Sequence, residues 1–191
     1  MDDCLALALI FSSPELQLEG VTCVYGDVDL RAHGDQVASA AQPPGVTGHG
    51  GASEPLLGLR TVFWPGHEGL GLLEPEDEAI EPDREHAVDF IMRKAMENPG
   101  EIHLVAVGPL TNVAMAFLRE PQLSERLAHL TIMAGVIRGT ADLQLPYVEH
   151  NVRCDPEAAH VSPLRSSRKL TCRHRKRHKY SKKSALGVRQ C

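Results

Sequence analysis

Apolar residues follow two different periods along this chain. Between residues 86 and 98 they recur every three to four positions, which predicts an amphipathic helix that ends at Pro99 and Gly100. The segments 102–108 and 127–135 are instead short and almost continuously apolar, as in strands that are buried on both faces. The same criteria predict these further elements: helices over 2–12, 29–41 and 109–120 and from Asp155 onward, and strands over 16–26 and within 43–58.

Helices and strands alternate in this expected order, and the strands at 102–108 and 127–135 are of the buried type. That pattern is typical of an α/β domain with a doubly wound, mostly parallel sheet. In such folds ligands bind at the carboxyl ends of the strands. The loops near Gly26, Gly108 and Gly135 are therefore the places where we expect functional side chains.

The periodic pattern ends at Ser162, and the charge of the chain changes at about the same place. All 25 acidic residues but only 9 of the 20 Lys and Arg residues lie in residues 1–160, whereas the other 11 basic residues lie in 161–191. A segment with so much charge and so few large apolar residues cannot bury enough surface to offset its loss of conformational entropy. We therefore expect a folded domain over 1–161 and a basic, disordered tail over 162–191.

Composition argues against several classes of protein. No apolar run reaches the roughly 18 residues that a transmembrane helix needs, so we expect no contact with membranes. Two acidic residues precede the first apolar stretch, where a secretory signal would carry basic ones. Five scattered cysteines without a C-x-x-C pair predict neither a disulfide framework nor a zinc site. We expect a cytoplasmic protein, or a nuclear one if the basic tail acts as an import signal.

Two polar motifs lie at expected starts of helices. Asp2 and Asp3 precede the apolar stretch "CLALAL", where paired carboxylates either complement the helix dipole or bind a hard cation through their oxygens. In "VGPLTNVA", Thr111 and Asn112 follow a strand and a Gly-Pro turn. Thr111 could offer an oxygen to a site, and the alternative is a plain turn between a strand and a helix.

A third polar motif, "VEHNVRCDPEAA", contains Glu149 and Asn151 two positions apart. If this segment is extended, the two side chains point to the same side, because successive side chains of a strand alternate between its faces. A carboxylate beside an amide suits the recognition of neighbouring hydroxyl groups on a sugar. The alternative is two surface residues on an edge strand.

Taken together, these motifs resemble one family. The stretches "MDDCLALAL", "GVTCVYGD", "VGPLTNVA", "TIMAGV" and "EHNVRCDPEAA" occur in the order and approximate spacing of the inosine–uridine-preferring nucleoside hydrolases. The resemblance runs from Met1 to about Val161 and corresponds to roughly the N-terminal half of a family domain. It implies an α/β fold and a calcium-dependent enzyme that hydrolyses the N-glycosidic bond of ribonucleosides to a free base and ribose.

The resemblance also implies roles for particular residues. Asp2, Glu149 and Asn151 match the family's ribose-binding residues. Asp3 matches a calcium chelator, and Thr111 matches the residue whose backbone carbonyl completes part of the calcium shell. The cofactor implied is Ca²⁺, and the substrate is a ribonucleoside.

The family's general base and general acid have no counterpart that we can place in this sequence. We therefore assign no catalytic residue and expect a chain that is truncated at both ends, binds calcium weakly, and is weakly active or inactive. One alternative is a catalytically inactive module that acts through a partner, and a homo-oligomer also stays open. A third hypothesis is that the basic tail binds nucleic acid. It is the weaker one, because Tyr180 is the only Phe, Trp or Tyr among its charges and no nucleic-acid-binding motif accompanies it.

Overall fold

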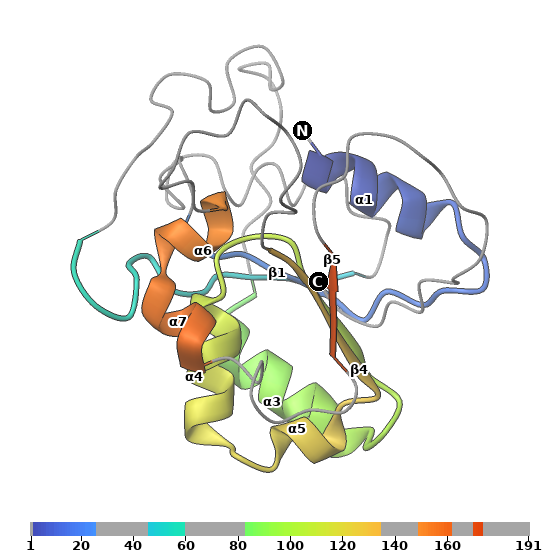
Figure 1. The fold of residues 1–191 in the computed structure, drawn as a ribbon. Coiled ribbons are helices and arrows are strands. Elements are labelled where there is room, and N and C mark those ends of the chain that lie inside the picture. The colour runs from blue at the N-terminus through green and yellow to red at the C-terminus, as the bar shows by residue number, and fades with distance from the viewer. Residues whose placement is uncertain (1, 26–45, 60–82, 135–148, 162–169, 174–191) are drawn as a thin grey trace.

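The computed structural model describes residues 2–25, 46–59, 83–134, 149–161 and 170–173. Figure 1 shows how the helices and strands of this part of the chain are arranged. The helices are α1 (Asp2–Phe11), α3 (Ala87–Glu97), α4 (Thr111–Arg119), α5 (Leu123–Arg126), α6 (His150–Cys154) and α7 (Pro156–Val161). The strands are β1 (Val21–Thr22), β2 (Gly48–His49), β3 (His103–Ala106), β4 (His129–Met133) and β5 (Leu170–Arg173).

All strand pairs among the described residues are parallel. Strands β1 and β2 form one pair, and β3, β4 and β5 form a three-stranded sheet with β4 in the middle. Val105 of β3 lies opposite Thr131 of β4, and Ile132 of β4 lies opposite Cys172 of β5. The predicted parallel sheet is therefore confirmed.

Helices cover both faces of β3. Leu104 packs in the larger core with α3, α4, α5 and α7, whereas the next residue, Val105, packs with Leu7 and Ile10 of α1 and with Val21 of β1. Successive side chains of a strand point to opposite faces, so the two cores lie on opposite sides of the sheet. Figure 1 shows α1 on one side and α3, α4 and α5 on the other. This arrangement agrees with the predicted doubly wound α/β fold.

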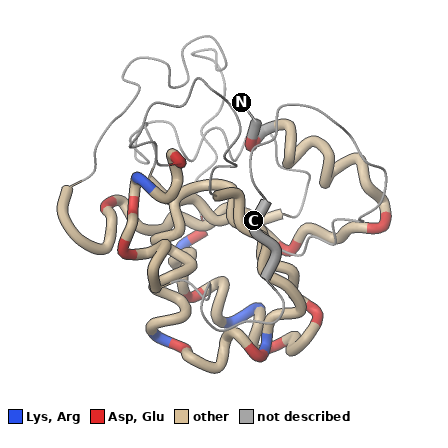
Figure 2. Tube along the Cα trace, in the orientation of Figure 1, with Lys and Arg blue, Asp and Glu red and all other residues tan. Residues whose placement is uncertain are grey.

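Helix α3 shows why these elements form where the sequence predicts them. Its buried face is apolar, and the His86 imidazole caps its start by accepting a hydrogen bond from the backbone N–H of Val88 at 3.2 Å. Arg93 on its outer face forms ion pairs with Glu85 and Glu97. Figure 2 shows Lys and Arg interspersed with Asp and Glu on this end of the molecule. No helix of the described part of the chain is long and apolar enough to cross a membrane.

The structure departs from the sequence-based picture in three places. Residues 150–154 form the helix α6, so the extended segment that would turn Glu149 and Asn151 to the same side is not present. The short helix α5 was missed because a single turn gives no periodic signal. Residues 170–173 form β5 inside the segment expected to be disordered, because β4 supplies a strand edge on which they pair. The rest of 162–191 and the helix predicted over 29–41 lie outside the described residues.

Candidate functional site

A buried carboxylate ties three segments together beside the sheet. Asp155 has no exposed surface, and its Oδ2 accepts hydrogen bonds from the Thr111 hydroxyl at 2.6 Å and from the backbone N–H of Leu56 at 2.9 Å. Its Oδ1 accepts from the backbone N–H of Ala158 at 2.8 Å, so it caps α7 as predicted. The start of α4, the loop after β2 and the start of α7 are thus held by one side chain.

Tyr25 links the same cluster to α6. Its hydroxyl lies 3.2 Å from the Thr111 hydroxyl and donates to the backbone carbonyl of Cys154 at 3.1 Å. Burial raises the pKa of Tyr25 to about 12, and the neighbouring Asp155 carboxylate adds to the rise, whereas the contact with the Thr111 hydroxyl opposes it. The phenol therefore stays protonated near neutral pH and remains a hydrogen-bond donor.

Asn112 joins the end of β1 to the loop after β2. Its Oδ1 accepts from the backbone N–H of Ala52 at 2.9 Å, and its Nδ2 donates to the backbone carbonyl of Cys23 at 2.8 Å. The side chain is 4% exposed, so water does not replace these partners readily. The stretch "VGPLTNVA", which could have been a plain turn between a strand and a helix, therefore also supplies a tertiary contact through Asn112.

Gly51 is required by this contact. A Cβ atom at position 51 would lie 2.3 Å and 2.4 Å from the side-chain atoms of Asn112 and 2.5 Å from the carbonyl oxygen of Cys23.

We expect Gly51→Ala to lower the free energy of unfolding by about 2 kcal/mol, because the added methyl group overpacks this site. Urea unfolding followed by circular dichroism measures the change. Gly50→Ala is the matched control, because a Cβ there meets nothing within 4 Å; equal effects of the two changes would contradict this account.

Asn151 holds α6 against the carboxyl ends of β3 and β4. Its Nδ2 donates to the backbone carbonyls of Val107 at 2.7 Å and Met133 at 3.0 Å, and the residue is 4% exposed. Both amide protons are therefore used. No described residue donates to its Oδ1, which leaves this oxygen as an acceptor at the edge of the sheet where doubly wound folds bind ligands.

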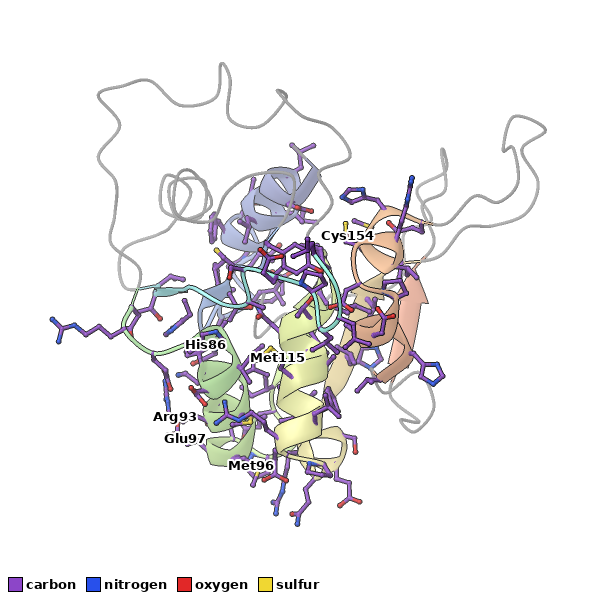
Figure 3. The ribbon with its side chains drawn as sticks, turned by 90° about the vertical axis from the view of Figure 1, so that its left-hand side faces the viewer. His86, Arg93, Met96, Glu97, Met115 and Cys154 are labelled. Carbon is purple, nitrogen blue, oxygen red and sulfur yellow. The ribbon has the colours of Figure 1, made fainter. Side chains whose placement is uncertain are left out.

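The structure brings some of the predicted site residues together. Thr111 and α6, which carries Asn151, both contact the cluster around Tyr25, and Glu149 caps α6 by accepting from the backbone N–H of Val152 at 3.2 Å. Asp3 is exposed in the first turn of α1, and Figures 1 and 3 show α1 and α6 at the same end of the molecule, away from α3 and α5. The side chain of Asp2 lies outside the described ones.

Sequence reasoning missed two members of this cluster. Tyr25 was read only as part of a strand, and Asp155 only as a helix cap. A local signal existed for one oxygen of Asp155, because "DPEAA" places an acid before a first-turn proline. No local pattern indicates that the other oxygen reaches Thr111, 44 residues away.

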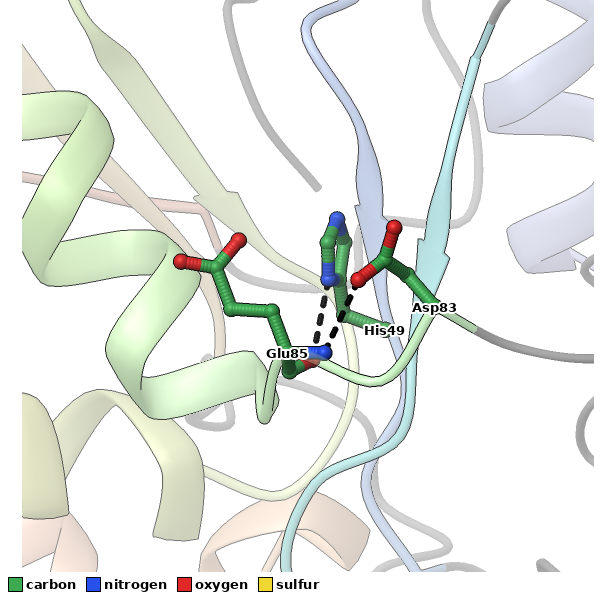
Figure 4. Close-up of side chains that lie close together, drawn as sticks. All are labelled: His49, Asp83 and Glu85. Carbon is green, nitrogen blue, oxygen red and sulfur yellow. Dashed lines mark hydrogen bonds between the residues drawn. The ribbon is translucent and has the colours of Figure 1, made fainter.

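A second group, His49, Asp83 and Glu85, brings three potential metal ligands together. One ligand atom from each residue lies within 4.8 Å of the others, and Figure 4 shows the three side chains where Asp83 runs beside β2. His49 is 2% exposed and stacks on Phe90, with ring centroids 3.8 Å apart. The donor set of one imidazole and two carboxylates would suit a transition metal better than calcium.

Hydrogen bonds already occupy much of this group. The two ring nitrogens of His49 lie 2.8 Å from the Thr47 hydroxyl and 3.0 Å from the backbone carbonyl of Glu85. The Glu85 carboxylate receives two hydrogen bonds of 2.7 Å from Arg93, which lower its pKa below the usual range. A metal would have to displace these partners, so the contacts favour a structural role for the group.

Comparisons with known proteins agree on one family. A model of the inosine-uridine preferring nucleoside hydrolases matches residues 1–168. Uridine nucleosidase 1 of Arabidopsis thaliana is 33% identical over 167 residues, which cover 84% of this chain and 49% of that protein. The inosine-uridine preferring nucleoside hydrolase of Leishmania major is 34% identical over 169 residues, which cover 84% and 53%.

Solved structures give the same result. A plant nucleoside hydrolase, the PpNRh1 enzyme, superposes with a TM-score of 0.77 at 27% identity over 91% of this chain and 56% of that chain. An inosine-guanosine nucleoside hydrolase superposes with a TM-score of 0.74 at 27% identity and the same coverage. The chain thus spans about half the length of the curated relatives and solved structures that it matches.

Proposed function

Because the chain belongs to the inosine-uridine preferring nucleoside hydrolase family, we propose that the carboxyl ends of its strands form part of a ribonucleoside-binding site. Asn151 carries this proposal. Its amide protons are fixed on the carbonyls of Val107 and Met133, so its Oδ1 has a defined position and can accept a hydrogen bond from a sugar hydroxyl.

Glu149 supports the same proposal from the start of α6. Its Oε2 caps the helix, and this hydrogen bond fixes the position of the carboxylate at the start of α6, the helix that carries Asn151. The other oxygen, Oε1, is then an acceptor for a second ribose hydroxyl. Asp2 is proposed as a third ribose ligand on the strength of the family resemblance.

Calcium is the proposed cofactor, with the Asp3 carboxylate and the Thr111 backbone carbonyl as ligands. Both are hard oxygen donors of the kind that calcium prefers. The Thr111 hydroxyl is committed to Asp155, so the backbone carbonyl is the group that Thr111 can offer. Calcium takes six to eight oxygens in proteins. Asp3 and Thr111 together supply fewer oxygens than this number. We therefore propose weak calcium binding and derive no catalytic step through the metal.

The proposed reaction of the family domain is hydrolysis of the N-glycosidic bond to a base and ribose. Its transition state resembles an oxocarbenium ion. Hydrogen bonds that the ribose hydroxyls donate to protein acceptors can therefore strengthen as positive charge develops on the sugar. Glu149 and Asn151 are suited to that role. We assign no residue of this chain as general base or general acid and therefore propose that its own turnover is low.

Nucleoside binding and turnover test the proposal separately. We expect inosine or uridine to shift the NMR signals of the chain in the presence of calcium, and Glu149→Gln to weaken this binding about tenfold, because a charged hydrogen bond to the sugar is replaced by a neutral one. Glu157→Gln on α7 is the matched control. Absence of any nucleoside binding would disprove the proposed site.

Turnover is measured as release of the free base. We expect a rate constant below about 1 s⁻¹, the lower end of common enzyme values. A faster, calcium-dependent rate would refute the proposal of low activity while leaving the proposed binding site intact.

A further inference from the structure

Helix α6 carries a thiol and an imidazole in contact. The Sγ atom of Cys154 lies 3.6 Å from Nε2 of His150, within hydrogen-bonding distance for sulfur. The two residues are one helical turn apart and therefore share a face of the helix. Both are partly exposed, so small solutes can reach them. Neither residue belongs to the proposed nucleoside or calcium ligands.

Both ends of this short helix are fixed by hydrogen bonds. Glu149 caps its start, and the backbone carbonyl of Cys154 accepts a hydrogen bond from Tyr25, whose aromatic ring is buried. The next residue, Asp155, is held by three donors. Hydrogen bonds at three residues, Glu149, Cys154 and Asp155, thus hold the segment that carries the pair, which keeps the thiol and the imidazole one turn apart on an ordered helix.

We propose that Cys154 is an oxidisable thiol that is activated by His150, and that its reactants are small peroxides. The sulfur attacks one peroxide oxygen, and the O–O bond breaks as the S–O bond forms. With hydrogen peroxide the thiol proton passes to His150 and then to the departing hydroxide, which leaves as water. The sulfur loses two electrons, the peroxide gains them, and the product is Cys154 sulfenic acid.

The charges around Cys154 make His150 necessary for this chemistry. The imidazole accepts the thiol proton and so favours the thiolate. The carboxylate of Asp155 and the C-terminal end of α6 oppose a thiolate. The Asp155 charge is spread over its hydrogen bonds to Leu56, Thr111 and Ala158, which weakens this opposition. A thiol in this setting depends on its base, so removal of the imidazole is a sensitive test.

Cys23 provides an internal comparison. Neither Cys23 nor Cys154 forms a disulfide, and both are partly exposed. Cys23 packs against the apolar cluster of α1, β1 and β3, an environment that disfavours the thiolate. If the imidazole activates Cys154, the two cysteines of one molecule should differ in rate under identical conditions.

The experiment treats the full chain with hydrogen peroxide at pH 7, traps sulfenic acid with dimedone, and measures each cysteine by mass spectrometry. We expect Cys154 to react at least about tenfold faster than Cys23, because the thiolate is the nucleophile and the Cys154 thiol has an imidazole at hydrogen-bonding distance. We expect His150→Gln to remove this advantage and His160→Gln, on the exposed part of α7, to leave it unchanged.

If the His150→Gln variant does not fold, the same rates are measured on wild-type chain that has been unfolded in urea. In unfolded wild-type chain the pair is separated, so the rate at Cys154 should fall to that of Cys23. Equal rates for the two cysteines in the folded protein would overturn the proposal. A rate at Cys154 that is unchanged by His150→Gln in a folded variant, or by urea, would overturn it as well.

Discussion

Replacing Asp155 with alanine is expected to lower the free energy of unfolding by about 4 kcal/mol. The change leaves the Thr111 hydroxyl and the backbone N–H groups of Leu56 and Ala158 without their acceptor in a position that has no exposed surface. Each buried donor that loses its partner costs roughly 1–3 kcal/mol. The loss is a large share of the 5–15 kcal/mol that a domain of this kind possesses.

Urea unfolding of the variant measures this effect. The matched control is Asp89→Ala, which removes an exposed carboxylate that pairs with Arg119 at 2.7 Å. Exposed ion pairs contribute about 0–1 kcal/mol, so the control should stay within that range. If Asp155→Ala were no more destabilising than Asp89→Ala, the buried network would not contribute to stability as we argue.

The second large effect is expected for Asn112→Asp. The new carboxylate keeps the acceptor for Ala52 but sets a second oxygen against the carbonyl of Cys23, where the amide had donated. One hydrogen bond is replaced by repulsion between two acceptors, and a charge is buried without a partner. We expect a loss of about 3 kcal/mol at pH 7, measured by urea unfolding.

This loss should depend on pH in a defined direction. Burial raises the pKa of an unpaired carboxyl in the folded state above its unfolded value, so the folded state binds the proton more tightly. The variant should therefore recover stability relative to wild type as the pH falls from 7 toward 5. Asn98→Asp at the end of α3, where the amide donates to the Lys94 carbonyl near the surface, is the control. A pH-independent deficit at Asn112 would contradict the proposed burial of charge.

The periodic elements of this fold were predictable from sequence because their signals are local. Residues 86–98 repeat at the helical period, and 102–108 and 127–135 are continuous apolar runs, so α3, β3 and β4 lie where expected. Asp155 followed by proline and an acidic residue likewise predicted the start of α7.

The remaining elements depend on contacts between distant segments. The alternation around Glu149 fitted an extended segment equally well, and the carbonyls of Val107 and Met133 that hold Asn151 lie at the carboxyl ends of two separate strands. Strand β5 exists because β4 offers it an edge. The same limit applies to the site. The residue types pointed to sugar hydroxyls and calcium, whereas the roles of Asp155 and Tyr25 follow only from tertiary structure. The predicted functions of all five site residues stay predictions: Asp2, Asp3, Thr111, Glu149 and Asn151.

The hydrogen bond from Tyr25 to the Cys154 carbonyl has a consequence for how the chain is made. Its partners are 129 residues apart, and those of Thr111 and Asp155 are 44 apart. At about 5–20 residues per second, a ribosome takes roughly 6–26 s to pass from one end of the longer contact to the other. During that time the Tyr25 hydroxyl lacks the Cys154 carbonyl, its acceptor in the folded protein. The contact can form only after α6 has been synthesised, so it belongs to a late stage of folding.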